Sequence, residues 1–280
     1  MKTIKAERIT QEVARLTQEA NFFLGDDVIT AFKKAYQNPL ESDIGKEIMD
    51  QLLKNAEIAR NEKVPMCQDT GYAVIFLEVG QDLKIEGNLI EAIQEGVRLG
   101  YKEGYLRKSI VAHPFRRINT TDNTPAVIYS EIVSGDNLKI VVAPKGGGSE
   151  NMSKIKMLKP ADGKQGVIEF VLDTVKKAGP NPCPPIVVGV GIGGTFEKTA
   201  ILAKKALLRE LSSEHHDPEI AELERKLLTK INKLGIGPAG LGGLTTALAV
   251  NIEIYPCHIA SLPVAVNINC HATRHREVVL

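Results

Sequence analysis

A polar seven-residue stretch, residues 65–71, separates a long helical pattern from a strongly apolar one and constrains the fold on both sides. It reads Pro-Met-Cys-Gln-Asp-Thr-Gly, so a thiol, an amide, a carboxylate and a hydroxyl precede a glycine that permits a sharp turn. Residues 6–62 repeat apolar side chains at helical spacing, and residues 72–79 form the apolar run of a buried strand. We therefore expect a loop between rigid elements, where functional sites are often built. On its own, a loop cysteine is more often a small buried residue than a ligand.

The rest of the chain alternates helical and strand patterns. Helical patterns cover residues 88–105, 163–178, 196–211 and 219–234, and apolar runs cover 126–133, 138–143, 186–190, 245–255 and 260–267. Residues 134–137, Ser-Gly-Asp-Asn, predict a β-hairpin between the first two of these runs. No linker, repeat or low-complexity tract interrupts the pattern. The sequence predicts a single compact α/β (α+β) domain over residues 1–280, with a helical layer over about 1–62 and a core with mixed sheets over about 63–280.

The composition excludes several classes of protein. The chain has 280 residues, is 43% hydrophobic and carries a net charge of +1, so neither nucleic acid nor an anionic membrane is expected as a partner. No apolar run approaches the roughly 20 residues that span a bilayer. The N-terminus is charged and lacks an apolar signal core, which predicts a cytoplasmic protein. In that compartment four cysteines do not suit a disulfide framework, and they are expected to be buried residues, ligands or nucleophiles.

Two glycine-rich stretches could bind an anion. Residues 145–151, Lys-Gly-Gly-Gly-Ser-Glu-Asn, can bring backbone N–H groups close to a ligand, although a flexible surface loop would read the same way. Gly189, Gly191 and Gly194 satisfy the G-x-G-x-x-G pattern of dinucleotide-binding folds between a strand and a helix. A second helix, rather than a strand, follows that helix. A close packing contact or a carboxylate at the helix N-terminus is therefore favoured over a nucleotide.

Three cysteines lie in loops at the ends of predicted strands. Cys67 is in the loop described above, Cys183 lies among four prolines that fix the backbone, and Cys270 follows the last predicted strand. They form no C-x-x-C pair, which argues against a zinc ribbon or finger. Three separate thiolates suit an iron–sulfur cluster in which one iron has no protein ligand and is open to act as a Lewis acid.

The sequence resembles the α chain, or N-terminal domain, of class I iron–sulfur fumarate hydratases and the related L-tartrate dehydratases over nearly its whole length. The resemblance rests on the motifs Cys67-Gln68-Asp69-Thr70-Gly71, Asn119 with Asp122-Asn123-Thr124-Pro125, residues 145–151, Asn181-Pro182-Cys183-Pro184 and Asn269-Cys270-His271. It implies a [4Fe-4S] cluster ligated by Cys67, Cys183 and Cys270. Cys257 is left as a cysteine that is not a ligand.

The resemblance also implies residues that contact a dicarboxylate substrate. Gln68, Asp69, Arg107, Gly147 and His258 are expected to bind it, and the planar guanidinium of Arg107 suits a carboxylate. Asp69 and His258 are the expected catalytic residues, with Asp69 in the proton-transfer network. Without the resemblance, Arg107 reads as a surface ion pair and His258 as a core histidine.

Single-chain members of the family carry a second domain after the cluster domain, whereas this chain stops ten residues after Cys270. The resemblance therefore implies a separate β subunit that completes the active site in a hetero-oligomer such as (αβ)2. The expected reaction is reversible hydration of fumarate to L-malate, and L-tartrate dehydration is the alternative. More distant alternatives are a non-catalytic cluster-binding module and a nucleotide-binding protein.

Overall fold

The computed structural model describes residues 2–280 and confirms the mixed α/β class. The chain divides into two compact units, each built on a four-stranded sheet. Unit 1 comprises residues up to 24, 56–147 and 274–280, and unit 2 comprises residues 25–55 and 148–273. The predicted boundary near residue 62 does not coincide with these units, because part of the N-terminal helical region belongs with the second sheet. None of the helices in the described part of the chain combines the length and apolar content needed to span a bilayer.

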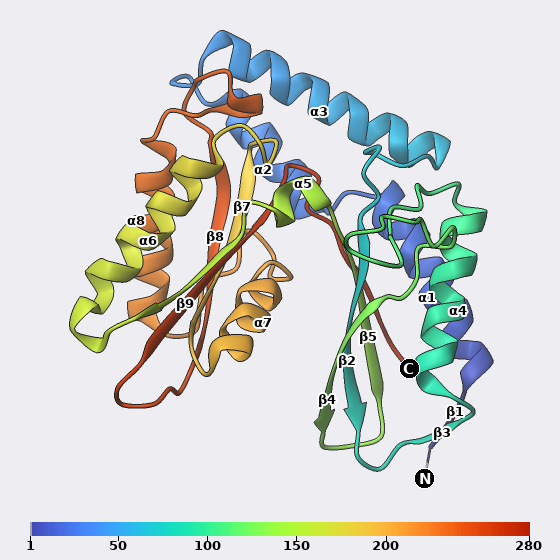
Figure 1. The fold of residues 1–280 in the computed structure, drawn as a ribbon. Coiled ribbons are helices and arrows are strands. Elements are labelled where there is room, and N and C mark those ends of the chain that lie inside the picture. The colour runs from blue at the N-terminus through green and yellow to red at the C-terminus, as the bar shows by residue number, and fades with distance from the viewer. Residues whose placement is uncertain (1) are drawn as a thin grey trace. The chain divides into compact units, whose positions relative to one another are not determined.

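Unit 1 is a sheet with two helices on one face. Its elements are β1 (Thr3–Lys5), α1 (Ala6–Phe22), β2 (Tyr72–Gly80), β3 (Lys84–Glu86), α4 (Leu89–Glu103), β4 (Val127–Val133), β5 (Leu138–Lys145) and β10 (Arg276–Val279). The strand order is β10-β5-β2-β4, and α1 packs along α4 (Figure 1). Ile75 and Ile140 of the sheet, Val13 of α1 and Ile93 of α4 share one buried core. Burial of such side chains contributes about 1.5–3 kcal/mol each.

The predicted hairpin at residues 134–137 is wrong. Strands β4 and β5 are joined there, but β2 lies between them, parallel to β4 and antiparallel to β5. Backbone hydrogen bonds from residues 80–82 to the connection place the end of β2 beside it. Because β2 is buried along most of its length, it suits the central position between two neighbours better than an edge. Residues 134–137 do form a tight connection, as their composition indicates, but the two strands that they join are not paired with each other.

Unit 2 has helices on both faces of its sheet. Its elements are α2 (Asp26–Gln37), the first part of α3 (Asp43–Glu62), most of α5 (Gly147–Glu150), β6 (Lys154–Leu158), a 3₁₀ turn at Pro160–Asp162, α6 (Gly163–Ala178), β7 (Ile186–Gly193), α7 (Phe196–Ala206), α8 (Pro218–Asn232), a 3₁₀ turn at Pro238–Gly240, β8 (Ala247–Tyr255) and β9 (Leu262–Asn269). The strand order is β6-β9-β7-β8. Helices α6 and α8 share a core with one face, and α7 packs on the strands from the other side (Figure 1).

The glycine pattern in β7 serves helix packing. A Cβ atom at Gly189 would collide with the carbonyl oxygen of Ala203, and one at Gly191 with that of Thr199, both in α7. The missing side chains let α7 approach the strand closely, while the alternate residues Val188 and Val190 face the α6 and α8 side. This favours the packing interpretation of the G-x-G-x-x-G match. Strand β8 does return parallel to β7, but only after both α7 and α8.

Glu41 stabilises the segment of unit 2 that leads into β8. Its buried carboxylate accepts hydrogen bonds from the backbone N–H of Leu244 at 2.9 Å and of Thr245 at 2.8 Å, and from the Thr245 hydroxyl. Burial alone raises the pKa of this carboxyl, but the hydrogen bonds outweigh burial and hold the pKa below its ordinary value of 4.5. The ionised form therefore stabilises the fold.

We expect Glu41→Gln to lower the free energy of unfolding by about 1–3 kcal/mol, because an amide cannot accept all of these hydrogen bonds. The contribution of ionised Glu41 is present above its unfolded pKa and is lost as the pH falls through the lower native pKa. Denaturant unfolding of both proteins between about pH 7 and pH 3 measures this. The stability difference should shrink toward acid pH, and a difference that stays constant across this range would contradict the role of the charge.

Candidate functional site

Asp69 is the centre of the polar group in unit 1. Its Oδ1 accepts a hydrogen bond from the Gly71 N–H at 3.0 Å, and its Oδ2 accepts one from the Gly147 N–H at 2.8 Å. The Asp69 carbonyl oxygen accepts a hydrogen bond from Arg274 Nη2 at 2.6 Å. Two predicted site residues, Asp69 and Gly147, are therefore in direct contact although 78 positions separate them. The carboxylate is half-buried and held in one orientation.

Hydrogen bonds to its backbone fix the loop around Asp69. The buried hydroxyl of Tyr101 lies 2.8 Å from the Thr70 carbonyl oxygen and 2.9 Å from that of Gly71. Burial raises the pKa of Tyr101, so the hydroxyl stays protonated and acts as the hydrogen-bond donor to these carbonyl oxygens. The Asn123 side-chain amide donates to the Gly71 carbonyl at 3.1 Å, and the Met66 N–H donates to Asn21 of α1 at 3.0 Å. The loop is therefore a rigid platform.

Cys67, Gln68 and Arg107 lie around the same loop. The Cys67 thiol is half-buried and 3.5 Å from Gln68 Oε1, and the Gln68 side chain is exposed. The Thr70 hydroxyl donates to the Arg107 carbonyl at 2.9 Å, so the Arg107 backbone is fixed beside the loop while the residue remains exposed. Unit 1 thus brings together five of the predicted site residues, which are Cys67, Gln68, Asp69, Arg107 and Gly147.

Unit 2 brings Cys183 and Cys270 together. Strands β7 and β9 are antiparallel neighbours with Val187 opposite Asn269, so the residues before β7 and after β9 lie at the same end of the sheet. His271, next to Cys270, donates its backbone N–H to the Cys183 carbonyl at 3.2 Å, and its Nδ1 is 3.2 Å from the same oxygen. Cys183 is exposed and Cys270 is half-buried, so neither is sealed in the core.

The backbone at Cys183 is strained. Its φ of 56° lies in the left-handed region, which a side chain disfavours. The segment is held there by the Cys183 N–H bond to the Pro180 carbonyl at 3.0 Å and by the Ala239 N–H bond to the Pro184 carbonyl at 2.8 Å. Residues held in such conformations cost about 1–3 kcal/mol and cluster at functional sites.

His258 lies at the opposite end of the unit 2 sheet. Strand β8 runs parallel to β7 and ends at Tyr255 opposite Gly193, and Cys257 and His258 lie in the turn that follows. The eight residues of β9 separate this turn from Cys270, which at about 3.3 Å per residue is roughly 26 Å. The structure therefore does not bring His258 to the cysteine pair.

The three predicted ligands are thiols, which suit an iron–sulfur cluster, but they are divided between the two units. Cys183 and Cys270 form an accessible pair at one sheet end in unit 2, and Cys67 is accessible in unit 1. Within residues 2–280, no group of three or more His, Cys, Asp or Glu side chains is arranged to hold a metal ion. The donor set suits a cluster with one open iron, and the ligand assignment stays a prediction.

A second polar group, within unit 2, fixes the end of the glycine-rich segment. Glu150 accepts from Lys204 of α7 at 2.6 Å and from the Asn267 side-chain amide of β9 at 2.9 Å. Ser153 accepts from the same Asn267 amide at 3.0 Å. The segment at residues 145–151 is therefore ordered, rather than the flexible surface loop that the sequence alone allowed.

Sequence reasoning missed the supporting residues Tyr101 and Arg274. Tyr101 reads as one more apolar residue of a helix, and nothing in its spacing signals the position of its hydroxyl. Arg274 lies in a polar closing stretch with several charged residues. Both act through backbone carbonyls, which leave no trace in a sequence.

Comparison with known proteins identifies the class to which this fold and site belong. Residues 10–279 match the family described as Fumarate hydratase (Fumerase). A relative named putative L(+)-tartrate dehydratase subunit alpha, from Methanocaldococcus jannaschii, is 47% identical over 274 residues, with 95% of each chain covered. The L(+)-tartrate dehydratase subunit alpha of Escherichia coli (strain UTI89) is 35% identical over 271 residues, covering 95% of this chain and 89% of the relative.

The chain belongs to the fumarate hydratase (Fumerase) family. This confirms the family resemblance drawn from the cysteine, amide and glycine motifs. The names of the family and of these relatives indicate a hydro-lyase, that is, a dehydratase.

Proposed function

We propose that this chain is the α subunit of an iron–sulfur hydro-lyase that adds water reversibly to fumarate, giving L-malate. The observation that supports this most directly is the Asp69 carboxylate, held by the N–H groups of Gly71 and Gly147 in the loop that also carries Cys67 and Gln68. A carboxylate oriented in this way beside a thiol and an exposed amide suits positioned proton transfer near a ligand. The membership of the chain in the fumarate hydratase family supports the same reaction.

We propose Cys67, Cys183 and Cys270 as ligands of a [4Fe-4S] cluster. When bound, such a cluster supplies an open iron that acts as a Lewis acid on the hydroxyl and one carboxylate of the substrate. The accessible pair in unit 2 and the rigid loop in unit 1 support this donor set.

The remaining chemistry falls to side chains around the Cys67 loop. Arg107 and Gln68 bind and orient the dicarboxylate, since both are exposed while the backbone around them is fixed. Asp69 takes part in moving the proton at the carbon next to the one that carries the hydroxyl. The Gly147 N–H donates to Asp69, so Gly147 acts at the substrate through the orientation of that carboxylate.

A second subunit completes the site in this proposal. The relatives are named as alpha subunits, which supports a β subunit and an assembly such as (αβ)2. That subunit would supply the groups that this chain lacks, including a hydroxyl through which Asp69 exchanges the proton.

L-tartrate is the second candidate substrate. The relative at 35% identity is named L(+)-tartrate dehydratase subunit alpha, and the one at 47% carries the same name preceded by "putative", which favours this substrate specifically. Tartrate differs from malate by one additional hydroxyl, so the same residues suit either diacid.

Turnover of the anaerobically reconstituted αβ complex tests the reaction. We expect hydration of fumarate or dehydration of L-tartrate, with kcat/KM in competition deciding between them. Asp69→Asn should lower kcat by about 10²–10⁴-fold, because it removes a positioned acid–base group. Full turnover by this chain alone would contradict the shared site, and turnover of neither diacid by the complex would refute the proposed reaction.

The iron and sulfide content of anaerobic protein tests the ligand set. Cys67→Ser, Cys183→Ser and Cys270→Ser should each lose most of the bound iron and sulfide, because a serine hydroxyl is a poor substitute for a thiolate at iron. Cys257→Ser is the matched control and should keep the content of the wild-type protein, since Cys257 lies at the other end of the sheet. Equal losses in all four variants would contradict the assignment.

We propose that His258 joins the site from another copy of the chain, because roughly 26 Å of β9 separates it from Cys270 within unit 2. We expect His258→Ala and Cys270→Ser to be inactive as separate αβ complexes. Mixing the two should restore part of the activity, since sites that combine an intact Cys270 with an intact His258 can then form. Failure of the mixture to gain activity would remove His258 from the site.

A further inference from the structure

Residues 105–121 form an ordered projection beside the Cys67 loop, which we call the basic hairpin. The Ala112 N–H donates to the Ile118 carbonyl at 2.7 Å, and the Thr120 N–H donates to the Ile110 carbonyl at 2.9 Å. At the tip, the Phe115 and Arg116 N–H groups lie 3.2 and 3.3 Å from His113 Nδ1. The hairpin is held together by its own hydrogen bonds.

The base of the basic hairpin is attached to the candidate site. Asn123 Oδ1 accepts from the Ser109 N–H at 2.7 Å, and the amide of the same residue donates to Gly71. The Thr70 hydroxyl donates to the Arg107 carbonyl. Whatever covers the hairpin therefore lies next to Arg107 and the Asp69 loop.

The basic hairpin exposes large apolar side chains. Tyr105 and Phe115 are each 90% exposed, and Ile118 is 63% exposed. A disordered loop could move such groups freely, but this hairpin holds them out in a fixed arrangement. Aromatic and arginine side chains fixed at a surface are typical of the centres of protein–protein interfaces.

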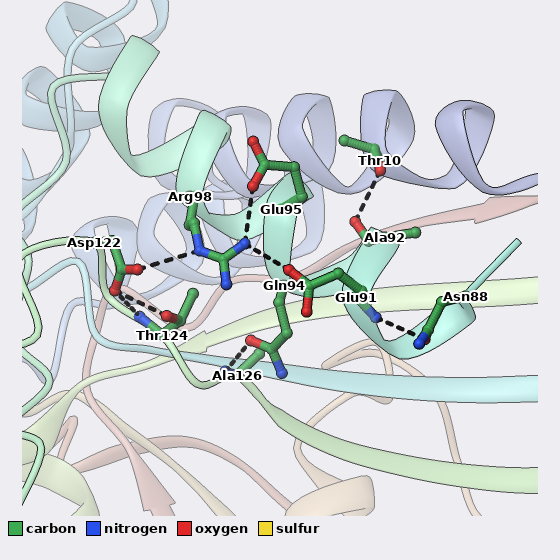
Figure 2. A network of polar contacts seen from close by, with 10 residues as sticks. All are labelled: Thr10, Asn88, Glu91, Ala92, Gln94, Glu95, Arg98, Asp122, Thr124 and Ala126. Carbon is green, nitrogen blue, oxygen red and sulfur yellow. Dashed lines mark hydrogen bonds and ion pairs between the residues drawn. The ribbon is translucent and has the colours of Figure 1, made fainter.

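All formally charged side chains of the basic hairpin are positive. Its 17 residues include Arg107, Lys108, Arg116 and Arg117 and no Asp or Glu. Asp122, which directly follows the hairpin in the sequence, is bound to Arg98 at 3.2 Å and accepts two hydrogen bonds from Thr124 (Figure 2). Burial raises the pKa of Asp122, but these hydrogen bonds outweigh it and keep the pKa below its ordinary value. Arg98 also contacts Glu91 and Glu95, so Asp122 is held in an ion-pair cluster with residues of α4.

This charge distribution argues against a second copy of the chain as the occupant. In a two-fold dimer the same patch meets itself, so this face would set four cations against four cations. Such like-charge contacts disfavour association. A different protein with carboxylates around an apolar pocket has the complementary surface.

We infer that the basic hairpin is the docking surface for the second subunit of the enzyme, and that the contacting surface of that subunit is acidic around an apolar pocket that receives Phe115. This inference rests on the proposed function, which supplies the second subunit. Docking at the hairpin would place the second subunit beside Arg107 and Asp69, where the site needs further groups.

The affinity of purified full-length chain for the second subunit, measured by anaerobic titration calorimetry, tests the inference. Phe115→Asp and the double variant Arg116→Glu/Arg117→Glu should each weaken binding by at least about tenfold, equivalent to about 1.4 kcal/mol. Wild-type affinity should fall between about 50 mM and 500 mM salt, because the contact is electrostatic, and the double variant should respond less.

Two substitutions on α4 of the same unit serve as matched controls. Ile90→Asp changes an apolar side chain that is 51% exposed, and Lys102→Glu reverses an exposed cation. Both should bind the second subunit like the wild-type chain. Circular dichroism and the thermal midpoint establish that the hairpin variants keep the fold.

Wild-type affinity in the hairpin variants would overturn the inference, and so would a wild-type chain that binds duplex DNA or anionic vesicles through the hairpin but not the second subunit. Hairpin-dependent assembly without turnover of fumarate or tartrate would refute the proposed reaction and leave the docking surface standing. Turnover by a complex whose assembly does not depend on the hairpin would support the proposed reaction and refute the docking surface.

Discussion

The hydrogen bonds from Gly71 and Gly147 to the Asp69 carboxylate hold the unit 1 half of the candidate site together. They are possible because β2 and β5 are antiparallel neighbours with Tyr72 opposite Lys145. The loop before β2 and the glycine-rich segment after β5 therefore lie at the same end of the sheet. The register of two buried strands fixes where the carboxylate meets the backbone donor, and core packing fixes the register.

The same rule arranges unit 2. Strands β7 and β9 are antiparallel, so Cys183 before one and Cys270 after the other share a sheet end, and the turn with Cys257 and His258 takes the other end. Cys257 and Cys270 are similar in sequence context, since each lies in a loop beside a strand and precedes a histidine. The family motif singles out Cys270, and the structure adds that Cys270 and Cys257 lie at opposite ends of the sheet.

The sequence predicted most elements of regular structure, because their apolar periodicities are long and clear. Helix α6 is found at the predicted residues 163–178. Strands β6 and β10 were missed because they are short and half-exposed, so they lack an apolar run. Pairing was harder: residues 134–137 signal a tight connection, but the insertion of β2 depends on long-range packing. For the site, motifs identified Asp69 and Gly147 separately, while their hydrogen bond depends on strand register.

Two exposed apolar regions in the described part of the chain differ in charge. The basic hairpin carries four cations, whereas residues 254–261, which include His258 and the 91% exposed Ile259, carry no formal charge when the histidine is neutral. An uncharged apolar tip can meet its own copy around a two-fold axis without like-charge repulsion, and a basic one cannot.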